Sequence, residues 1–283
     1  MAVSRLAGVH RVIARAADTF RGGQSMSRVH ALRVKLFADG ADLGGILKMY
    51  ANPLIRGFTT NPTLMRKAGV DDYEAFARKV LAAVPDRPVS LEVFADDFAE
   101  MIRQAGIIAS WGSNVNVKIP VTNTRREFSG AVIRELSEAG VTLNVTAIQT
   151  LEQVRRVAEA LAPSAPAIVS VFAGRVADTG VDPVPLMREA VKILAARPQA
   201  ELLWASPREL LNVFQADEVG CHIITATNDI LAKLPLVGKA LDDYSLETVE
   251  MFRRDALAAG YAIAAAASGR RTPAAAATAS ARS

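Results

Sequence analysis

Lys118 is the residue whose surroundings in the sequence best suit covalent chemistry. It lies within the apolar run Val115–Pro120, whereas the other seven lysines are predicted to occupy helices or loops. In a strand, Asn116 and Lys118 share one face, and the branched side chains between them share the other. We expect the Lys118 face to be the interior of the fold, where burial disfavours the charged form of an amine. A neutral amine is the nucleophile that forms a Schiff base with a carbonyl compound.

The alternative is a structural lysine paired with a carboxylate, and Asp39 and Glu92 are the acids placed to provide one. The same two acids also fit the catalytic interpretation. Cleavage of a carbon–carbon bond through an iminium needs a base that removes a hydroxyl proton, and iminium formation needs a second group that manages water. Asp39 and Glu92 would supply both, although Asp39 could instead cap a helix and Glu92 could instead form an ion pair.

An anion site is indicated further along the chain by Arg175, Ser206 and Arg208. Ser206 and Pro207 are predicted to be the N-cap and first residue of a helix, whose free N–H groups attract anions. Two guanidinium groups beside such a helix end would hold a phosphate. Surface ion pairs are the alternative interpretation of the arginines, above all of Arg208.

Short β-branched runs alternate with amphipathic helical segments along the part of the chain that carries these residues. The predicted strands are Val34–Ala38, Ile55–Thr60, Val89–Phe94, Val115–Ile119, Val141–Thr146, Ala167–Phe172, Glu201–Ala205 and His222–Thr225. The predicted helices are Tyr73–Val84, Asp97–Ser110, Arg125–Ala139, Leu151–Ala162, Pro185–Ala195, Pro207–Ala216 and Asn228–Lys233, with Asp97 and Thr150 as N-caps. Eight such strands separated by helices predict an α/β fold, a single-domain (β/α)8 barrel.

A doubly wound open sheet has the same periodicity, so the position of the polar residues decides between the two folds. Asn61, Asn144, Thr146 and Ser170 join the residues above at or near the ends of predicted strands. In a barrel, the carboxyl ends of all the strands meet at one face and form the site there. A nucleotide-binding sheet would have a glycine-rich turn after its first strand, which the sequence Asp39–Asp42 does not provide.

Composition excludes several other classes of protein. A single cysteine, Cys221, and three histidines leave too few ligands for a zinc site and no pair for a disulfide, which fits the reducing cytoplasm. Cys221 and His222 are adjacent, so on a strand they point to opposite faces and cannot form a dyad. No apolar run approaches the ~18 residues of a membrane span. We therefore expect no metal site and no membrane span.

The net charge of +4 belongs to the ends of the chain. Residues 1–30 hold five arginines against one aspartate, and residues 268–283 hold three arginines and no acid, which leaves 25 basic and 28 acidic residues in between. A nucleic-acid surface would need a basic body, so we expect no nucleic-acid partner. Residues 31–267 are the predicted catalytic barrel, and 268–283 a disordered Ala/Ser/Arg tail. Residues 1–30 are predicted to be a disordered or non-native extension, with Met26 as the natural start or, alternatively, a transit peptide.

The order of these motifs resembles the transaldolase family. In chain order the motifs are Asp39, Thr59-Thr60-Asn61-Pro62, Glu92, Val117-Lys118-Ile119-Pro120, Asn144-Val145-Thr146, Ser170-Val171-Phe172-Ala173-Gly174-Arg175 and Ala205-Ser206-Pro207-Arg208. The resemblance runs from about residue 34 to residue 255, and the stretches KLFADGADL, GFTTNPTLMRKAG and EVFAD are similar to the short bacterial branch that lies close to the fructose 6-phosphate aldolases.

This resemblance implies a role for each matching residue. Lys118 would form the Schiff base, Asp39 would act on the substrate hydroxyl, and Glu92 and Thr146 would hold the water used in proton transfer. The hydroxyls of the three-carbon unit would contact Asn61, Asn144 and Ser170, and the sugar phosphate would contact Arg175, Ser206 and Arg208. Transaldolases move a dihydroxyacetone unit from a ketose phosphate to an aldose phosphate without metal or cofactor, and relatives of the short branch are often homo-oligomers.

Two positions bear on the outcome of the reaction. Members that release free dihydroxyacetone from fructose 6-phosphate have Gln and Tyr where this chain has Glu92 and Phe172, so the resemblance favours transfer. Pro207 stands where many transaldolases have an aromatic residue, which leaves a modified sugar open as substrate. A barrel without catalysis that binds sugar phosphates is the distant alternative. The apolar segment Leu257–Ile263 is a candidate for exchange with a neighbouring copy.

Overall fold

The computed structural model describes residues 28–263, so the predictions for residues 1–27 and 264–283 lie outside it. The described chain forms two compact units that divide after Gly238. The first unit contains the predicted barrel and already includes Val29, which is buried in its core. The second unit contains the long helix α12 (Leu241–Ala258). No helix between residues 28 and 263 is long and apolar enough to cross a membrane.

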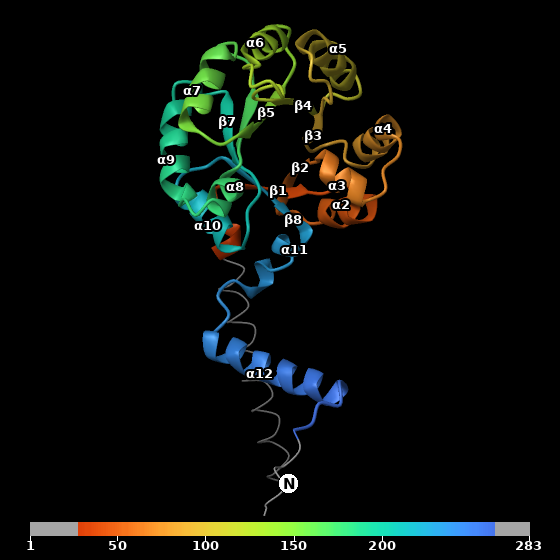
Figure 1. Ribbon diagram of the computed structural model, residues 1–283, viewed down its shortest axis with the longest axis vertical. Helices are drawn as coiled ribbons and strands as arrows, with labels where there is room; N and C mark the ends of the chain where they lie inside the picture. The colour runs from red at the N-terminus through yellow and green to blue at the C-terminus, as the bar shows by residue number, and fades with distance from the viewer. Residues whose placement is uncertain (1–27, 264–283) are drawn as a thin grey trace, which may run out of the picture. The chain divides into compact units, whose positions relative to one another are not determined.

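Eight parallel strands form a closed barrel in which β8 pairs with β1. Figure 1 shows these strands within the ring of helices that follow them. The strands are β1 (Lys35–Asp39), β2 (Ile55–Thr59), β3 (Val89–Glu92), β4 (Val115–Pro120), β5 (Leu143–Ile148), β6 (Ala167–Val171), β7 (Ala200–Trp204) and β8 (Ile223–Thr227). The predicted (β/α)8 barrel is confirmed, and the open sheet is excluded.

Each helix of the barrel unit follows a strand or extends the loop after it. The helices are α2 (Leu43–Tyr50), α3 (Pro62–Lys67), α4 (Tyr73–Ala83), α5 (Phe98–Ala109), α6 (Gly130–Glu138), α7 (Leu151–Ala160), α8 (Ala173–Asp178), α9 (Pro183–Leu194), α10 (Leu211–Glu218), α11 (Asn228–Leu231) and a 3-10 turn (Leu234–Leu236). Asp97 and Thr150 cap α5 and α7 as predicted, and Thr150 forms a capping box with Gln153. Asp42 caps α2 by accepting a hydrogen bond from the Gly45 N–H.

Two helices begin later than the sequence predicts. The segment predicted as the start of α6 instead forms a tight loop, closed by an antiparallel bridge between Thr122 and Phe128. The side-chain oxygen of Asn123 holds this loop by accepting from the N–H groups of Arg125 and Glu127. Helix α10 begins at Leu211 and not at Pro207, so Ser206 and Pro207 do not form its N-terminus, which corrects that prediction.

The barrel has two apolar layers, one outside the sheet and one inside. Val115, Val117 and Ile119 face outward into the core between sheet and helices, as the alternation in β4 predicts. A small separate cluster fills the middle of the barrel and consists of Phe37, Ile168, Leu203, Ala205 and Ile223. Polar side chains occupy the interior above and below this cluster. Lys35 is one of them. It begins β1, as the predicted strand Val34–Ala38 implies, so the statement that every lysine except Lys118 lies in a helix or loop is wrong.

Candidate active site

A pocket of about 610 Å³ opens at the carboxyl ends of the strands. The sequence-predicted site residues all line it, namely Asp39, Asn61, Glu92, Lys118, Asn144, Thr146, Ser170, Phe172, Arg175, Ser206 and Arg208. They come from β1, β3, β4, β5 and β6 and from the segments that follow β2, β6 and β7. The convergence of so many strand ends at one face is a property of parallel barrels, and it is why distant residues meet here.

Lys118 points into this pocket from β4 and is only 8% exposed. Its backbone pairs with Glu92 on one side and Asn144 on the other, so the three side chains lie in one layer of the barrel. The Lys118 Nζ donates to the backbone carbonyl of Thr60 and lies 3.6 Å from Glu92 Oε2. The amine is thus fixed by one carbonyl and one carboxyl group while it remains in contact with the pocket.

Glu92 is buried beside this amine, and its two oxygens differ in their surroundings. Oε2 lies 3.1 Å from the hydroxyl oxygen of Thr60, whereas the buried Oε1 has no hydrogen-bond partner in the described part of the chain. Burial raises the pKa of the Glu92 carboxyl, although the charge of Lys118 acts in the opposite direction. A carboxyl group with a raised pKa can serve as a proton donor near neutral pH.

Asp39 lies at the end of β1 in a network of hydroxyl and amide donors. Its Oδ1 accepts from Thr59 Oγ1 at 2.8 Å, and its Oδ2 accepts from Asn61 Nδ2 at 3.4 Å. Asn61 caps α3 by accepting from the N–H of Leu64 at 2.9 Å, which turns its amide nitrogen towards Asp39. Burial raises the pKa of Asp39, and the charge of Lys118 opposes the shift.

Thr225 completes this network from β8, and sequence reasoning missed it. Its hydroxyl oxygen lies 2.6 Å from that of Thr59. Because the Thr59 proton is directed at Asp39, Thr225 is the donor in this pair. The alternation of inward and outward side chains along β8 could have revealed Thr225. Ile223 is buried inside the barrel, and Thr225 and Thr227 lie on the same face of the strand.

A second network crosses the pocket from β3 to β6. Ser170 donates to the Asn144 side-chain oxygen at 2.7 Å, and the Asn144 amide nitrogen donates to Ser90 Oγ at 3.0 Å. All three side chains are buried. These bonds orient the Asn144 amide, with its oxygen towards Ser170 and its nitrogen towards Ser90. Ser90 was also missed, although it precedes Glu92 by two residues and therefore shares its face.

The cationic rim of the pocket is built differently from the prediction. Arg208 pairs with Asp178, with Nε 2.8 Å from Oδ1, and Arg175 lies 5.8 Å from the centre of the Phe172 ring. The N–H of Arg208 donates to Asn212 Oδ1 at 2.8 Å, so it is not free to meet an anion. An anion at this rim would therefore be held by the two guanidinium groups and not by the end of α10.

Ser206 owes its position at the rim to an unusual backbone. Its φ of 58° lies in the left-handed region, which a residue other than glycine rarely adopts. The loop passes so close to α8 that a Cβ on Gly174 would lie 1.5 Å from the Ser206 carbonyl oxygen. Gly174 is thus required for the close approach of the two segments. Thr146 and Phe172 also line the pocket, and Phe172 immediately precedes α8.

The fold and the pocket together define a (β/α)8 barrel with a buried lysine, a buried carboxyl group and a partly buried one at the carboxyl ends of its strands. Comparison of the sequence with known families then gives a sharper result. The chain belongs to the Transaldolase/Fructose-6-phosphate aldolase family, whose sequence profile matches residues 36–267. The resemblance drawn from the motifs is therefore confirmed.

Individual relatives agree with this assignment. A protein of Dehalococcoides mccartyi named probable transaldolase is 36% identical over 202 residues, which cover 71% of this chain and 90% of the relative. A Listeria monocytogenes protein named probable transaldolase 2 is 34% identical over 215 residues, with 75% and 94% covered. The crystal structure of dihydrodipicolinate synthase from Rhodopseudomonas palustris matches with a TM-score of 0.51 at 16% identity over 80% of each chain, which supports the barrel fold alone.

Proposed function

We propose that this protein is a transaldolase that moves a dihydroxyacetone unit from a ketose phosphate resembling fructose 6-phosphate to an aldose phosphate. The observation that carries the proposal is the buried Lys118 amine, held 3.6 Å from Glu92 in a pocket that also contains Asp39. Membership of the family supports the same activity. The proposal calls for no metal and no cofactor, because the lysine itself provides the electron sink once the iminium has formed.

The first half of the reaction attaches the donor sugar to Lys118. The neutral amine adds to the ketone carbon, and the carbinolamine that results loses water to give the iminium. Glu92 is the group placed to give and take the protons, because its raised pKa keeps it protonated at higher pH than an ordinary carboxyl group. Thr146 lies at the end of β5, the strand beside that of Lys118, and would hold the water molecule together with Glu92.

The second half breaks and remakes a carbon–carbon bond. Asp39 removes the proton from the hydroxyl beside the bond to be cleaved, the aldose leaves, and the bonding electrons move into the enamine on Lys118. An acceptor aldehyde then enters, the enamine carbon attacks it, and Asp39 returns the proton to the new hydroxyl. Hydrolysis of the iminium releases the product and the free lysine.

The remaining residues would hold the substrate in place. Asn61, Asn144 and Ser170 present amide and hydroxyl groups for the hydroxyls of the three-carbon unit. Arg175, Ser206 and Arg208 lie at the rim, where two guanidinium groups suit the sugar phosphate. Asp178 keeps the Arg208 guanidinium oriented before substrate arrives.

A second activity has support from the family itself, whose description includes fructose-6-phosphate aldolase. That enzyme would use the same iminium but release free dihydroxyacetone. Glu92 and Phe172 favour transfer, whereas Pro207 in the rim leaves a modified sugar as a further alternative. Turnover of fructose 6-phosphate measured with and without an aldose phosphate acceptor separates the two activities. We expect turnover that requires the acceptor, and release of dihydroxyacetone at the same rate without it would contradict transfer.

We also propose that the protein is a cytoplasmic homo-oligomer that binds sugar phosphates and neither nucleic acid nor membrane. None of the residues of α12 is buried within the described chain, although Leu241, Tyr244, Val249 and Phe252 lie along one side of it. An apolar helix face of this kind is stable in water when another surface covers it. A second copy of the chain is the covering surface that we propose.

A further inference from the structure

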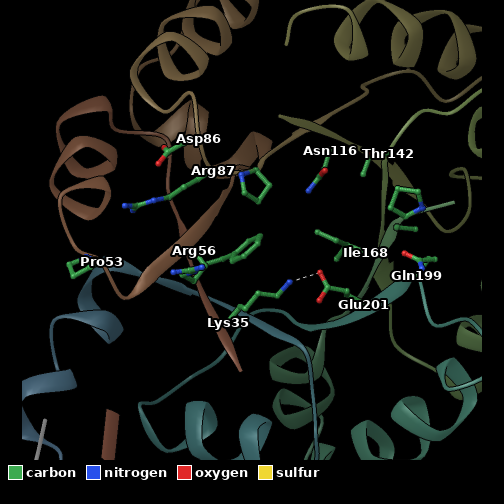
Figure 2. A pocket seen from close by; sticks show the side chains of 14 residues that line it. Lys35, Pro53, Arg56, Asp86, Arg87, Asn116, Thr142, Ile168, Gln199 and Glu201 are labelled. Atoms are coloured by element: carbon green, nitrogen blue, oxygen red, sulfur yellow. Dashed lines mark hydrogen bonds and ion pairs between the residues drawn. The ribbon is translucent and has the colours of Figure 1, made fainter. Parts of the chain in front are cut away.

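The barrel has a second pocket at the opposite end from the candidate active site. It has a volume of about 570 Å³ and is lined by residues near the starts of the strands, among them Lys35, Arg56, Asn116 and Glu201. Figure 2 shows these side chains surrounding an open space, with the Lys35–Glu201 ion pair across one side of it. The floor is Phe37, which belongs to the apolar cluster in the middle of the barrel. Phe37, Ile168, Leu203 and Ile223 are all at most 5% exposed, so this cluster separates the two pockets.

The polar character of this end is unusual for the fold. Barrels of this kind fill their interior with layers of branched apolar side chains, and residues at the amino end of the strands normally serve stability. In this chain, the interior positions at that end are Lys35, Asn116, Thr142 and Glu201. A packed apolar layer is therefore replaced by an open pocket with hydrogen-bonding walls.

Asn116 gives the clearest argument against a purely structural role for this pocket. It is 7% exposed, and its side-chain amide has no hydrogen bond to any described residue. Figure 2 shows this amide directed into the pocket. The Asn116 amide is not among the side-chain groups of residues 28–263 that are sealed from solvent without a partner, so it remains open to the pocket. A ligand in the pocket would meet an amide that is free to donate and accept hydrogen bonds.

Arg56 adds an unpaired positive charge at the mouth. It is the extra residue of a register shift, since Leu36 pairs with Ile55 but the next residue, Phe37, pairs with Gly57. An irregularity of this kind commonly redirects a side chain, and here Arg56 joins the pocket lining. A Cβ on Gly57 would lie 2.5 Å from the Phe37 ring, so the pairing with Phe37 requires glycine at this position.

The other charged groups of the pocket already have partners. Lys35 Nζ lies 2.5 Å from Glu201 Oε2, and Asp86 accepts a hydrogen bond from the hydroxyl of Tyr50 at 2.7 Å. Arg87 lies over the Tyr50 ring at 4.5 Å. The exposed Arg56 makes no ion pair or hydrogen bond within residues 28–263. Three cations face two carboxylates, and Arg56 is the cation that has no partner within residues 28–263.

We propose that this pocket is a second ligand-binding site, which takes a small organic oxyanion. Arg56 would bind the carboxylate or phosphate group, and the Asn116 amide would bind the polar part of the ligand deeper in the pocket. The site would act independently of the reaction at Lys118, because the apolar cluster around Phe37 lies between the two pockets.

Calorimetric titration of the intact protein with inorganic phosphate, malonate and citrate tests this site. We expect at least one of these probes to bind with a Kd of about 1 mM or tighter, which is typical of a few charge-assisted hydrogen bonds. Arg56→Gln should weaken this binding at least tenfold. Arg188→Gln is the charge-matched control, because Arg188 is exposed on α9 and lies outside both pockets. Arg208→Gln distinguishes binding at the opposite end of the barrel and should leave the Arg56-dependent component in place.

Asn116→Leu provides a second readout that a structural asparagine would not give. The substitution removes the unpartnered amide at similar size, so we expect binding to weaken at least tenfold while the melting temperature of the free protein stays equal or rises. The proposal is overturned if no probe binds in an Arg56-dependent way. It is also overturned if Asn116→Leu lowers the melting temperature and leaves binding unchanged.

Discussion

At the scale of single residues, the proposed reaction depends on how burial affects the protonation of Glu92 and Asp39. Glu92 is buried and Asp39 is partly buried, and this loss of hydration raises the pKa of each carboxyl group. Both lie close enough to Lys118 for its charge to act in the opposite direction. Burial is the larger influence at both positions. Glu92 is the stronger candidate for proton exchange with the amine, because its Oε2 is 3.6 Å from the Lys118 Nζ.

Glu92→Gln should change how stability depends on pH. The folded chain holds the Glu92 proton at pH values where the unfolded chain, with an ordinary pKa of about 4.3, has released it. The stability of the wild type therefore falls as pH rises from the unfolded to the folded pKa, and the glutamine variant lacks this loss. Urea unfolding should show the variant gaining stability over the wild type as the pH rises above about 4.

The control for this measurement is Glu138→Gln, which makes the same chemical change at an exposed glutamate on α6. We expect it to follow the pH dependence of the wild type. A constant difference in unfolding free energy between the Glu92 variant and the wild type across this range would contradict the role of burial.

Asp39→Asn should separate the two halves of the reaction. Asparagine can still accept from Thr59 but cannot remove a proton, so we expect kcat for transfer to fall about 10²- to 10⁴-fold, the usual value of a lost general base. Schiff-base formation depends on Lys118 and should persist. Borohydride trapping of the variant with fructose 6-phosphate measures this directly, and a folded variant that no longer labels would show that Asp39 has another role.

At the scale of elements, the sequence predicts regular strands and long helices well and tight connections poorly. All eight predicted strands are present with ends shifted by at most two residues, because β-branched runs bounded by polar residues carry a strong local signal. The short helices α2, α3 and α8 were not among the predicted helices, since six to eight residues show little helical periodicity. The site residues on strands were placed correctly for the same reason, while the rim around Ser206 was not.

The segment around Ser206 shows why the rim escaped prediction. The pair Ser206–Pro207 has the composition of a helix start, yet Ser206 has a φ of 58° and the helix begins at Leu211. What decides the local conformation is the close approach of the loop to Gly174, which is remote in sequence. Contacts of this kind depend on the assembled barrel and leave no periodic signal in the sequence.

Gly174→Ala tests this close approach. The added methyl group would meet the carbonyl oxygen of Ser206, so backbone must move, and we expect a loss of about 1–3 kcal/mol in unfolding free energy together with a raised KM for the sugar phosphate. Gly106→Ala in α5 is the matched control, because no atom lies within 4 Å of its Cβ position. Alanine is the better helix former, so the control should gain up to about 1 kcal/mol. Equal effects of the two substitutions in urea unfolding would argue against the tight contact.

At the scale of the whole molecule, the barrel unit and the unit that contains α12 differ in how far they bury their apolar side chains. The barrel buries two apolar layers, whereas α12 carries Leu241, Tyr244, Val249 and Phe252 without burying any of them within the described chain. The barrel therefore explains the site on its own, and the apolar side of α12 requires a covering surface.

Phe252→Glu tests whether that surface is another copy of the chain. A charge in the middle of an apolar contact is costly to bury, so the variant should have a smaller molar mass than the wild type in size-exclusion chromatography with light scattering. Glu250→Gln changes a residue of α12 outside this side and should leave the molar mass unchanged. A wild type that is monomeric at all concentrations would contradict the proposed homo-oligomer.

The central claim is that Lys118 forms a covalent iminium with the donor sugar. Borohydride reduction of the protein in the presence of fructose 6-phosphate, followed by peptide mass spectrometry, tests it most directly. We expect a reduced three-carbon adduct on Lys118, which is lost in Lys118→Met while that variant remains folded. An adduct on a different lysine, or none on the folded wild type even with free dihydroxyacetone, would show that Lys118 is not the Schiff-base residue.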